Sequence, residues 1–553
     1  MTRITFKMLS VLSSIFLLVG CGGGVGGSSR AEKSDGGSGS SGGWHSLLSP
    51  DCSGTYCGVN GNAYTGNGIG VWYYKNNKNS DVSLDVSLSN VKNRDITIIF
   101  TNEGKGSAVL PNIPINTTLK NEIEMRAQSV GEYIDTFNHI PQGIRDFNAN
   151  PILQRSELNR AIIQPLSAKT WQVGEERDWN IYKSATQHEI RTEKLMRQTT
   201  LTNGRVVNIW IENGEYGNGK ITEAMLNDIS QKLNDVIGSA SGLIGEPWGE
   251  HHHSNLISNN QPLDIVFVNF DKNNSPFGLM GYFYALNNFL KAKYLTSNEA
   301  LAIFIDSETL YLHNDGELYT MSTIAHELTH AIHFYQRDVL MDDGFGIFLN
   351  EMSAVMMEDI AAKKIGTSFN DVRFRYTAWL KESLYRYDFS DWDAYGGDNS
   401  YDIAGSFGGF LLRQYGTDFY KTLFQIDSNL SIIGVNEDET ARERSLDILD
   451  RAIKQYDNEG GLTRALRHWG ASIAMLPYDA SPKGFGYPYK NSGNFEFEGF
   501  DGDSYRQYRI LPKSSSMTIY PHGHFPFLRK TTSNTFTETF KVPPQMSVSV
   551  VVQ

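Results

Sequence analysis

The chain has 553 residues, of which 20% are charged and 12% aromatic, and its formal net charge at pH 7 is −13. This length exceeds that of one ordinary domain and predicts about three of them. The negative charge argues against nucleic acid as a partner and against a polybasic contact with a membrane surface.

The first 20 residues have the pattern of an export signal. A short basic start precedes an apolar stretch, residues 8–19, which is too short to span a membrane. Leu18-Val19-Gly20-Cys21 resembles the lipobox of bacterial lipoproteins, which implies cleavage before Cys21 and acylation of its thiol and new amino group. Two or three acyl chains suffice for stable anchoring. We therefore expect a signal peptide over residues 1–20 and a lipid anchor at Cys21.

The segment after Cys21 is rich in glycine and serine as far as residue 43. This composition is typical of a flexible linker, so residues 21–43 are expected to be a tether between the anchor and the folded part. Cys52 and Cys57 are the remaining cysteines. In an oxidising compartment outside the cytoplasm, they are expected to form a local disulfide.

A strand-like pattern follows the tether. Apolar and polar side chains alternate in residues 82–88, residues 96–100 are apolar or β-branched, and residues 102–106 contain the glycines of a turn. This pattern predicts strands with one buried face. We expect residues 44–165 to form a β-rich N-terminal domain, a small β-sandwich, without catalytic groups of its own.

The pattern changes near residue 190. Strands are predicted at 206–211, 263–270 and 300–305, and an amphipathic helix is predicted at 222–237. A sheet that packs against helices is an α+β arrangement. We place this domain at residues 190–480.

The central feature of this domain is His326-Glu327-Leu328-Thr329-His330. On a helix, residues four apart lie on one face, so His326 and His330 can point two imidazoles at one ion. Glu327 stands beside them as a general base for water. The flanking residues are apolar almost all round, which predicts a buried helix.

A second predicted helix, residues 347–364, carries the candidates for a third ligand. Twenty residues separate His330 from Glu351, enough for a turn and a return helix. Glu351 is the expected ligand because it lies nearer the helix start, and Glu358, two turns later, is its rival. Glu358 or Asp359 is then the acceptor that orients a ligand histidine.

Two histidines and one glutamate leave the fourth position of zinc open, as a catalytic site requires. The metzincin arrangement needs a glycine and a third histidine at set places after the second histidine. His333 and Gln336 occupy those places, which excludes that arrangement. His333 is expected to lie near the pocket and not to bind the ion.

These motifs carry a family resemblance. His326-Glu327-Leu328-Thr329-His330, followed by Phe348-Leu349-Asn350-Glu351 and Glu358-Asp359, resembles the hyicolysin family of zinc metallopeptidases, within the thermolysin-like group that uses a glutamate as third ligand. Residues 263–268 and 281–283 resemble that family's strand and glycine-aromatic turn before the site. The likeness covers roughly residues 195–475.

The resemblance implies a thermolysin-like core that binds one zinc ion through His326, His330 and Glu351, with Glu327 as the base. Calcium is considered as a second ion. One departure is Val355, which stands where thermolysin itself has an aspartate four residues after its ligand glutamate.

Residues 369–475 have helical spacing and are expected to form a helical subdomain over the cleft. Tyr395, Tyr401 and His468 are candidates for the donor that stabilises the developing oxyanion. Tyr401 is preferred because it begins a segment that resembles the family, although a packed core tyrosine is an equal alternative.

Alternation returns at residues 515–520 and 536–552, and predicts a separate small β-domain at 490–553. The expected fold is therefore a multidomain α+β chain with a β-sandwich, a metallopeptidase core with a helical subdomain, and a C-terminal β-domain.

The expected function is a zinc-dependent endopeptidase that acts on proteins or peptides. It is expected in the bacterial cell envelope, held by Cys21 on the outer membrane or cell surface with its folded part outside the cytoplasm. Two alternatives from another class are a catalytically inactive surface adhesin and a solute-binding lipoprotein. Zinc dependence of proteolysis distinguishes the first hypothesis from both.

Overall fold

The computed structural model describes most of the chain, with gaps between the described ranges. These ranges are residues 47–110, 113, 137–138, 140–151, 170–184, 187–366, 372–381, 383–392, 394, 397–430, 437–512 and 517–553. Cys21, the expected signal peptide and tether, and Tyr395 lie outside the described residues.

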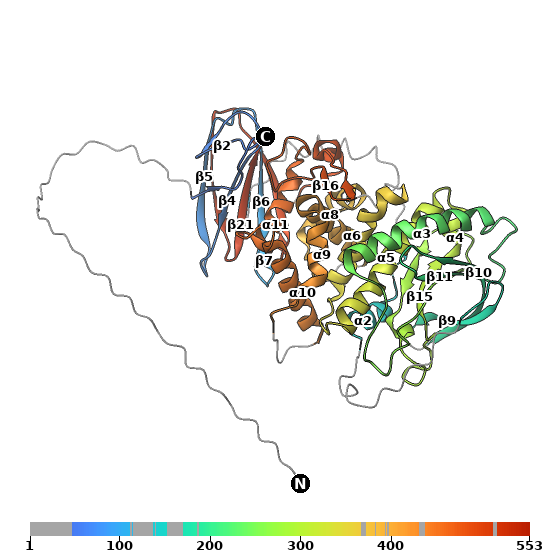
Figure 1. Ribbon diagram of the computed structural model, residues 1–553. Helices are drawn as coiled ribbons and strands as arrows, with labels where there is room; N and C mark the ends of the chain where they lie inside the picture. Colours follow the sequence, from blue (N-terminus) through green and yellow to red (C-terminus); the bar gives the residue numbers. More distant parts are fainter. Residues whose placement is uncertain are drawn as a thin grey trace, which may run out of the picture. The chain divides into compact units, whose positions relative to one another are not determined.

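A β-sandwich is built from both ends of the described chain (Figure 1). One sheet has the order β1-β4-β21-β6-β19 and the other the order β2-β3-β5-β20. The strands are β1 (Ser49–Pro50), β2 (Val59–Asn60), β3 (Ala63–Tyr64), β4 (Gly70–Lys75), β5 (Val82–Ser89), β6 (Asp95–Asn102), β19 (His524–Lys530), β20 (Thr535–Val542) and β21 (Met546–Val552).

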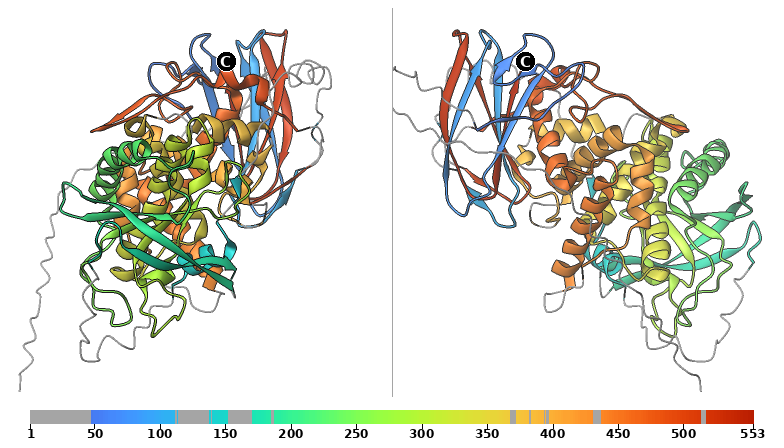
Figure 2. Two further views of the ribbon diagram at one scale, coloured as in Figure 1. Left: turned by 90° about the vertical axis from the view of Figure 1, so that its right-hand side faces the viewer. Right: turned by 60° about the vertical axis from the view of Figure 1, so that its left-hand side comes forward.

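The pairing of the late strands with the early ones corrects the expectation of two separate β-domains. β21 lies antiparallel between β4 and β6, β19 pairs with β6, and β20 pairs with β5. Figure 2 shows the red late strands among the blue early ones. Neither group forms a sandwich alone. β21 is the central strand of one sheet and β20 is an edge strand of the other, and both come from residue 535 onward.

β21 is covered on both faces, so its alternating serines, Ser547 and Ser549, do not mark an exposed face. Val548, Val550 and Val552 lie in the core of the sandwich. Val551 lies on the opposite face, in a cluster with Ala471 and Ala474 of the helical part. β21 is therefore an internal strand, between its neighbours in the sheet and between two apolar clusters.

Cys52 and Cys57 form a disulfide, which confirms the expected pairing. They lie between β1 and β2, where Cys57 also forms an isolated bridge with Ile69. The disulfide therefore constrains the first loop of the sandwich.

The second large sheet has six strands in the order β14-β15-β12-β11-β10-β9. They are β9 (Glu176–Ser184), β10 (Gln187–Thr200), β11 (Val206–Glu212), β12 (Leu263–Val268), β14 (Gly281–Phe283) and β15 (Leu301–Asp306). β11, β12 and β15 are parallel, whereas β14 is antiparallel to β15 and forms one edge. The predicted strands of the catalytic domain are thus present.

Helices pack on one face of this sheet and continue into a helical part. They are α3 (Glu223–Ile244), α4 (Ser307–Leu312), α5 (Gly316–His333), α6 (Ile347–Ile365), α7 (Val372–Lys381), α8 (Gly397–Tyr415), α9 (Thr417–Gln425), α10 (Glu437–Lys454) and α11 (Gly461–Ala471). A π-helical turn, η5 (Phe334–Val339), extends α5. α2 (Gln142–Ala149) lies at the β14 edge of the sheet and packs against α6, and its Ile144 joins the apolar cluster on the sheet face opposite α5.

Short elements complete the described chain. The 3-10 turns are η4 (Ala285–Asn288), η6 (Leu384–Arg386), η7 (Ser472–Ala474) and η8 (Gly502–Tyr508). The small paired strands are β7 (Ala108–Val109) with β18 (Thr518–Ile519), β8 (Phe137–Asn138) with β13 (Gly278–Leu279), and β16 (Lys490–Ser492) with β17 (Phe495–Phe497). Among the described helices, none combines the length and apolarity needed to cross a bilayer.

α5 and α6 follow from their sequences. α5 is apolar on most of its surface and packs against α3, α6 and β15, so it is buried nearly all round. α6 ends at Gly366, whose φ of 83° is the left-handed conformation that glycine adopts without steric cost. This confirms the expected helix and its stop within one residue.

Glu193, in the middle of β10, is a buried acid. Its side chain is 0% exposed, and neither carboxylate oxygen has a hydrogen-bond partner in the part of the chain that the structure describes. Burial, with Glu212 and Asp178 adding to it against the opposing Arg191 and Arg177, raises the pKa of Glu193 to about 9. The folded protein therefore holds a proton on Glu193 at neutral pH.

This proton makes stability depend on pH. The unfolded carboxyl has a pKa near 4.5, so the folded state binds more protons between about pH 4.5 and about 9. We expect the free energy of unfolding to fall as pH rises through that window, by up to about 1.4 kcal/mol per pH unit. Glu193→Gln should remove this slope in urea titrations at pH 6 and 8.5, whereas Glu459→Gln at an exposed site should keep it. An unchanged slope in Glu193→Gln would refute this origin.

Candidate active site

The site lies where α5 and α6 pack against each other. His326 and His330 occupy one face of α5, with ring centroids 4.8 Å apart. Glu351 comes from the second turn of α6. One ligand atom from each of these three residues lies within 4.8 Å of the other two. The structure thus brings the three predicted ligands together.

The distances among these atoms fit a zinc-sized ion. Glu351 Oε2 lies 3.3 Å from His326 Nε2 and 3.5 Å from His330 Nε2. Two ligands held about 2.0–2.1 Å from a tetrahedral zinc are themselves separated by about 3.3–3.4 Å. His330 Nε2 is buried and has no hydrogen-bond partner within the described ranges. The donors are therefore of the right type and spacing for zinc.

The other nitrogen of each imidazole is already engaged. His326 Nδ1 donates to Glu358 Oε1 at 2.5 Å, and His330 Nδ1 donates to Asn350 Oδ1 at 2.9 Å. Such contacts fix the tautomer and direct both Nε2 atoms at the shared point. Glu358 lies two turns after Glu351 and so reaches the same face, which makes the missing aspartate at Val355 unnecessary.

Two acids, Glu358 and Asp359, were expected to orient a ligand histidine. Glu358 contacts His326. Asp359 instead accepts a hydrogen bond from Arg413 Nη1 at 2.6 Å. The role of Asn350 was not predicted. The sequence did contain a hint of this role, because Asn350 directly precedes Glu351. Adjacent residues at a helix start can reach two histidines that lie one turn apart.

The charges of the cluster support one another. Burial alone would lower the pKa of His326, but Glu351 and Glu358 outweigh it and raise this pKa to about 10. Burial alone would raise the pKa of Glu351, but His330 and His326 hold it well below its usual range. In this cluster the ionised carboxylate of Glu351 and positive charge on the imidazoles therefore stabilise each other.

Glu327 lies beside the cluster and contacts the edge of the six-stranded sheet. Its Oε2 accepts a hydrogen bond from Phe283 N–H of β14 at 2.6 Å. Burial raises the pKa of this carboxyl, and His326 and His330 only partly oppose the effect. A carboxylate with a raised pKa is suited to accept and return a proton near neutral pH.

The three candidate oxyanion donors have different positions. Tyr401, on α8, donates its hydroxyl hydrogen to Glu351 Oε2 at 2.8 Å, so it is at the site. Burial and Glu351 raise the pKa of its hydroxyl well above the usual range, so it stays protonated. His468 is not at the site, because its Nδ1 donates to Gly484 O at 3.1 Å and its ring stacks on Phe485. Tyr395 lies outside the described residues.

His333 is also turned away from the cluster. Its Nε2 accepts a hydrogen bond from Phe345 N–H at 2.8 Å, and its Nδ1 faces Asp338 Oδ2 at 3.5 Å. Its role is to hold the chain between α5 and α6. Within the described residues, one group of side chains has the spacing of metal ligands, and it consists of His326, His330 and Glu351. No second group there supports the calcium ion that the sequence analysis considered.

Two family models match the chain. The model of peptidase M30 matches residues 187–553, and a model described as a domain of unknown function (DUF8571) matches residues 50–115. No curated protein matches the chain. The first match covers more than half of the sequence and includes both α5 and α6. The protein therefore belongs to the peptidase M30 family, the hyicolysin-type metallopeptidases that its motif resembles.

Proposed function

We propose that this metallopeptidase is a zinc-dependent endopeptidase with His326, His330 and Glu351 as ligands and Glu327 as general base. The observation that carries the proposal is the convergence of two Nε2 atoms and one carboxylate oxygen, while both Nδ1 atoms are occupied elsewhere. Membership of the peptidase M30 family supports hydrolysis of protein or peptide substrates.

When bound, zinc lowers the pKa of a coordinated water toward about 7 and polarises the substrate carbonyl. Glu327 takes a proton from the attacking water and delivers it to the leaving nitrogen. Its place between the histidine pair and β14 puts it beside the edge on which an extended peptide would lie. Phe283 N–H keeps one carboxylate oxygen in place during both transfers.

Tyr401 is proposed as the donor to the oxyanion. Its hydroxyl already lies 2.8 Å from Glu351 Oε2 and remains protonated because burial raises its pKa. A donor in a water-poor site stabilises developing negative charge more strongly than in bulk water.

The first test changes the base and keeps the ligands. Glu327→Gln should retain one zinc per chain, because the amide keeps the shape of the side chain and the ligands are untouched. It cannot accept the proton, so kcat for casein should fall by about 10²–10⁴-fold. Zinc content and casein cleavage measure the two effects. Glu317→Gln, near the other end of α5, is the control, and equal rates for both variants would contradict the proposal.

The second test separates the ligand from the residue that orients a ligand. Glu351→Ala should abolish tight zinc binding because it removes a donor atom. Glu358→Gln should lower zinc affinity by only about 10–100-fold, because His326 keeps its Nε2 but loses a charged acceptor at Nδ1. Competition with a chelator measures both affinities. The reverse order would assign the ligand role to Glu358.

We also propose that the protein is attached to the bacterial cell envelope through lipid on Cys21. The support is the sequence Leu18-Val19-Gly20-Cys21 after a short apolar stretch, followed by a tether rich in glycine and serine. The folded part would then act outside the cytoplasm, at the outer membrane or the cell surface.

Replacement of the acylated thiol tests the anchor. Cys21→Ala should abolish incorporation of labelled palmitate and shift the protein from the membrane fraction to the soluble fraction, since no acyl chain can enter the bilayer. Cys57→Ala is the matched control, because that cysteine belongs to the disulfide. Unchanged membrane association in Cys21→Ala would exclude the lipid anchor.

A further inference from the structure

The reactive groups of the site are closed off from solvent. His326, Glu327, His330, Glu351 and Tyr401 are each at most 8% exposed. An endopeptidase has to admit an extended polypeptide to the metal and the base. The structure therefore shows an arrangement in which the catalytic groups are assembled but covered.

α2 borders the site. It packs against α6, which carries Glu351, and against η4, which continues the edge strand β14. Its Arg145 is close enough to Tyr401 to oppose electrostatically the rise that burial and Glu351 impose on the pKa of the tyrosine. Residues 140–151, called the α2 segment here, thus contact both the helix that carries Glu351 and the edge strand β14.

One side chain of the α2 segment imitates a paired strand. Asn148 Nδ2 donates to Phe283 O at 2.7 Å, and Asn148 Oδ1 accepts from Ala285 N–H at 2.8 Å. A residue in a neighbouring parallel strand makes the same two bonds, to the carbonyl before and the N–H after its partner. One side-chain amide therefore uses edge groups that an added peptide strand would need.

Apolar contacts hold the same segment. Ile144 is fully buried in the apolar cluster on the sheet face opposite α5. The Phe147 ring packs edge-on against three other rings, those of Tyr284, Phe289 and Tyr294. These contacts, with Asn148, involve the side of α2 that faces β14 and η4.

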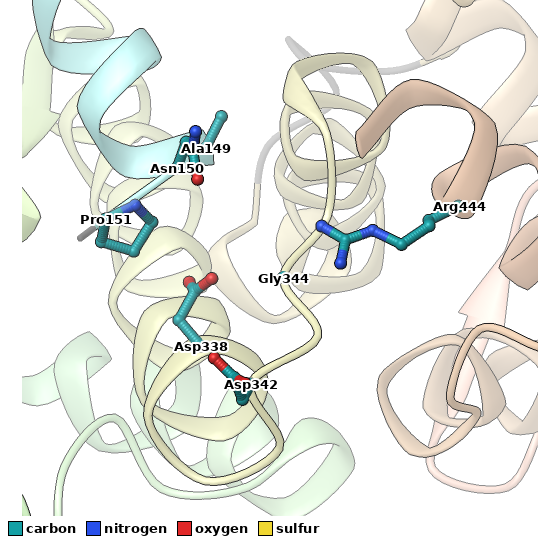
Figure 3. Close-up of a pocket in the computed structure, with 7 residues that line it drawn as sticks. All are labelled: Ala149, Asn150, Pro151, Asp338, Asp342, Gly344 and Arg444. Carbon is teal, nitrogen blue, oxygen red and sulfur yellow. The ribbon is translucent and has the colours of Figure 1, made fainter. Parts of the chain in front are cut away.

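The C-terminal end of the α2 segment borders a cavity. Ala149, Asn150 and Pro151 line a cavity of about 240 Å³ whose opposite walls include Asp338 and Arg444 (Figure 3). This cavity separates the end of the segment from η5 and α10.

The family match gives a further, independent observation. The peptidase M30 model begins at residue 187, and the other matched model ends at residue 115. The α2 segment lies between them. The part of the chain that matches the peptidase family therefore does not include the α2 segment.

We infer that the α2 segment is an autoinhibitory element that occupies the place of a substrate strand on β14 and must leave before a polypeptide can reach the metal site. This inference rests on the proposed function. Asn148 contributes two hydrogen bonds to the closed state, and Ile144 and Phe147 contribute apolar contacts.

The test weakens the closed state without touching the catalytic groups. Asn148→Ala removes both hydrogen bonds to the edge, and Asn148→Asp places an oxygen against Phe283 O. Gln142→Ala, at an exposed position of the same helix, is the control. The full zinc-loaded chain is used throughout, and circular dichroism checks that each variant is folded.

Two measurements report on closure, and one needs no turnover. The rate of zinc loss to excess chelator should rise about tenfold in both Asn148 variants, because the metal becomes accessible, and kcat/KM for casein should rise by a similar factor through KM. Gln142→Ala should match the parent in both. Unchanged or lower values in the Asn148 variants would overturn autoinhibition.

The outcomes also separate this inference from the proposed function. Faster zinc loss in the Asn148 variants, with no casein cleavage by any variant, would support the α2 segment as a cover and overturn the endopeptidase. Cleavage by the parent with no effect at Asn148 would support the endopeptidase and overturn the cover. A chain that binds no zinc would overturn both.

Discussion

The site depends on the burial of one carboxylate between two imidazoles. An isolated ionised carboxylate in this interior would be strongly destabilising, so Glu351 requires positive charge on its partners. Glu358 and Asn350 stabilise the imidazoles from behind and leave both Nε2 atoms facing Glu351. A divalent ion at that point would satisfy all of these atoms at once. The packing of α5 on α6 is therefore constrained by electrostatics as much as by apolar contact.

The edge strand β14 links this cluster to the rest of the sheet. Phe283 uses its N–H for Glu327 and its carbonyl for Asn148, so a single residue contacts both the base and the covering segment. Edge strands with free backbone groups attract other strands. Here the same property would serve substrate binding when the edge is free and autoinhibition when it is occupied.

Local spacing predicted most of the candidate site, whereas distant pairing could not be predicted. His326, His330 and Glu351 lie on two neighbouring helices, so helical periodicity and loop length place them together. Their role as ligands remains a prediction. Asn148 and Phe283 are 135 residues apart, and no local pattern connects an asparagine on a short helix with a strand edge. Strand alternation likewise identified both β-regions but not their union, since alternation carries no information about partners.

That union has a consequence for biogenesis. β21, at the very end of the chain, is the middle strand between β4 and β6, which are more than 440 residues earlier. During synthesis the early strands have no central partner until residues 546–552 have been made. Contacts of such sequence separation form slowly, and unpaired strands are prone to aggregation meanwhile. A translation product that ends before residue 546 would therefore lack the strand between β4 and β6, and its open sheet would offer unpaired edges to other chains.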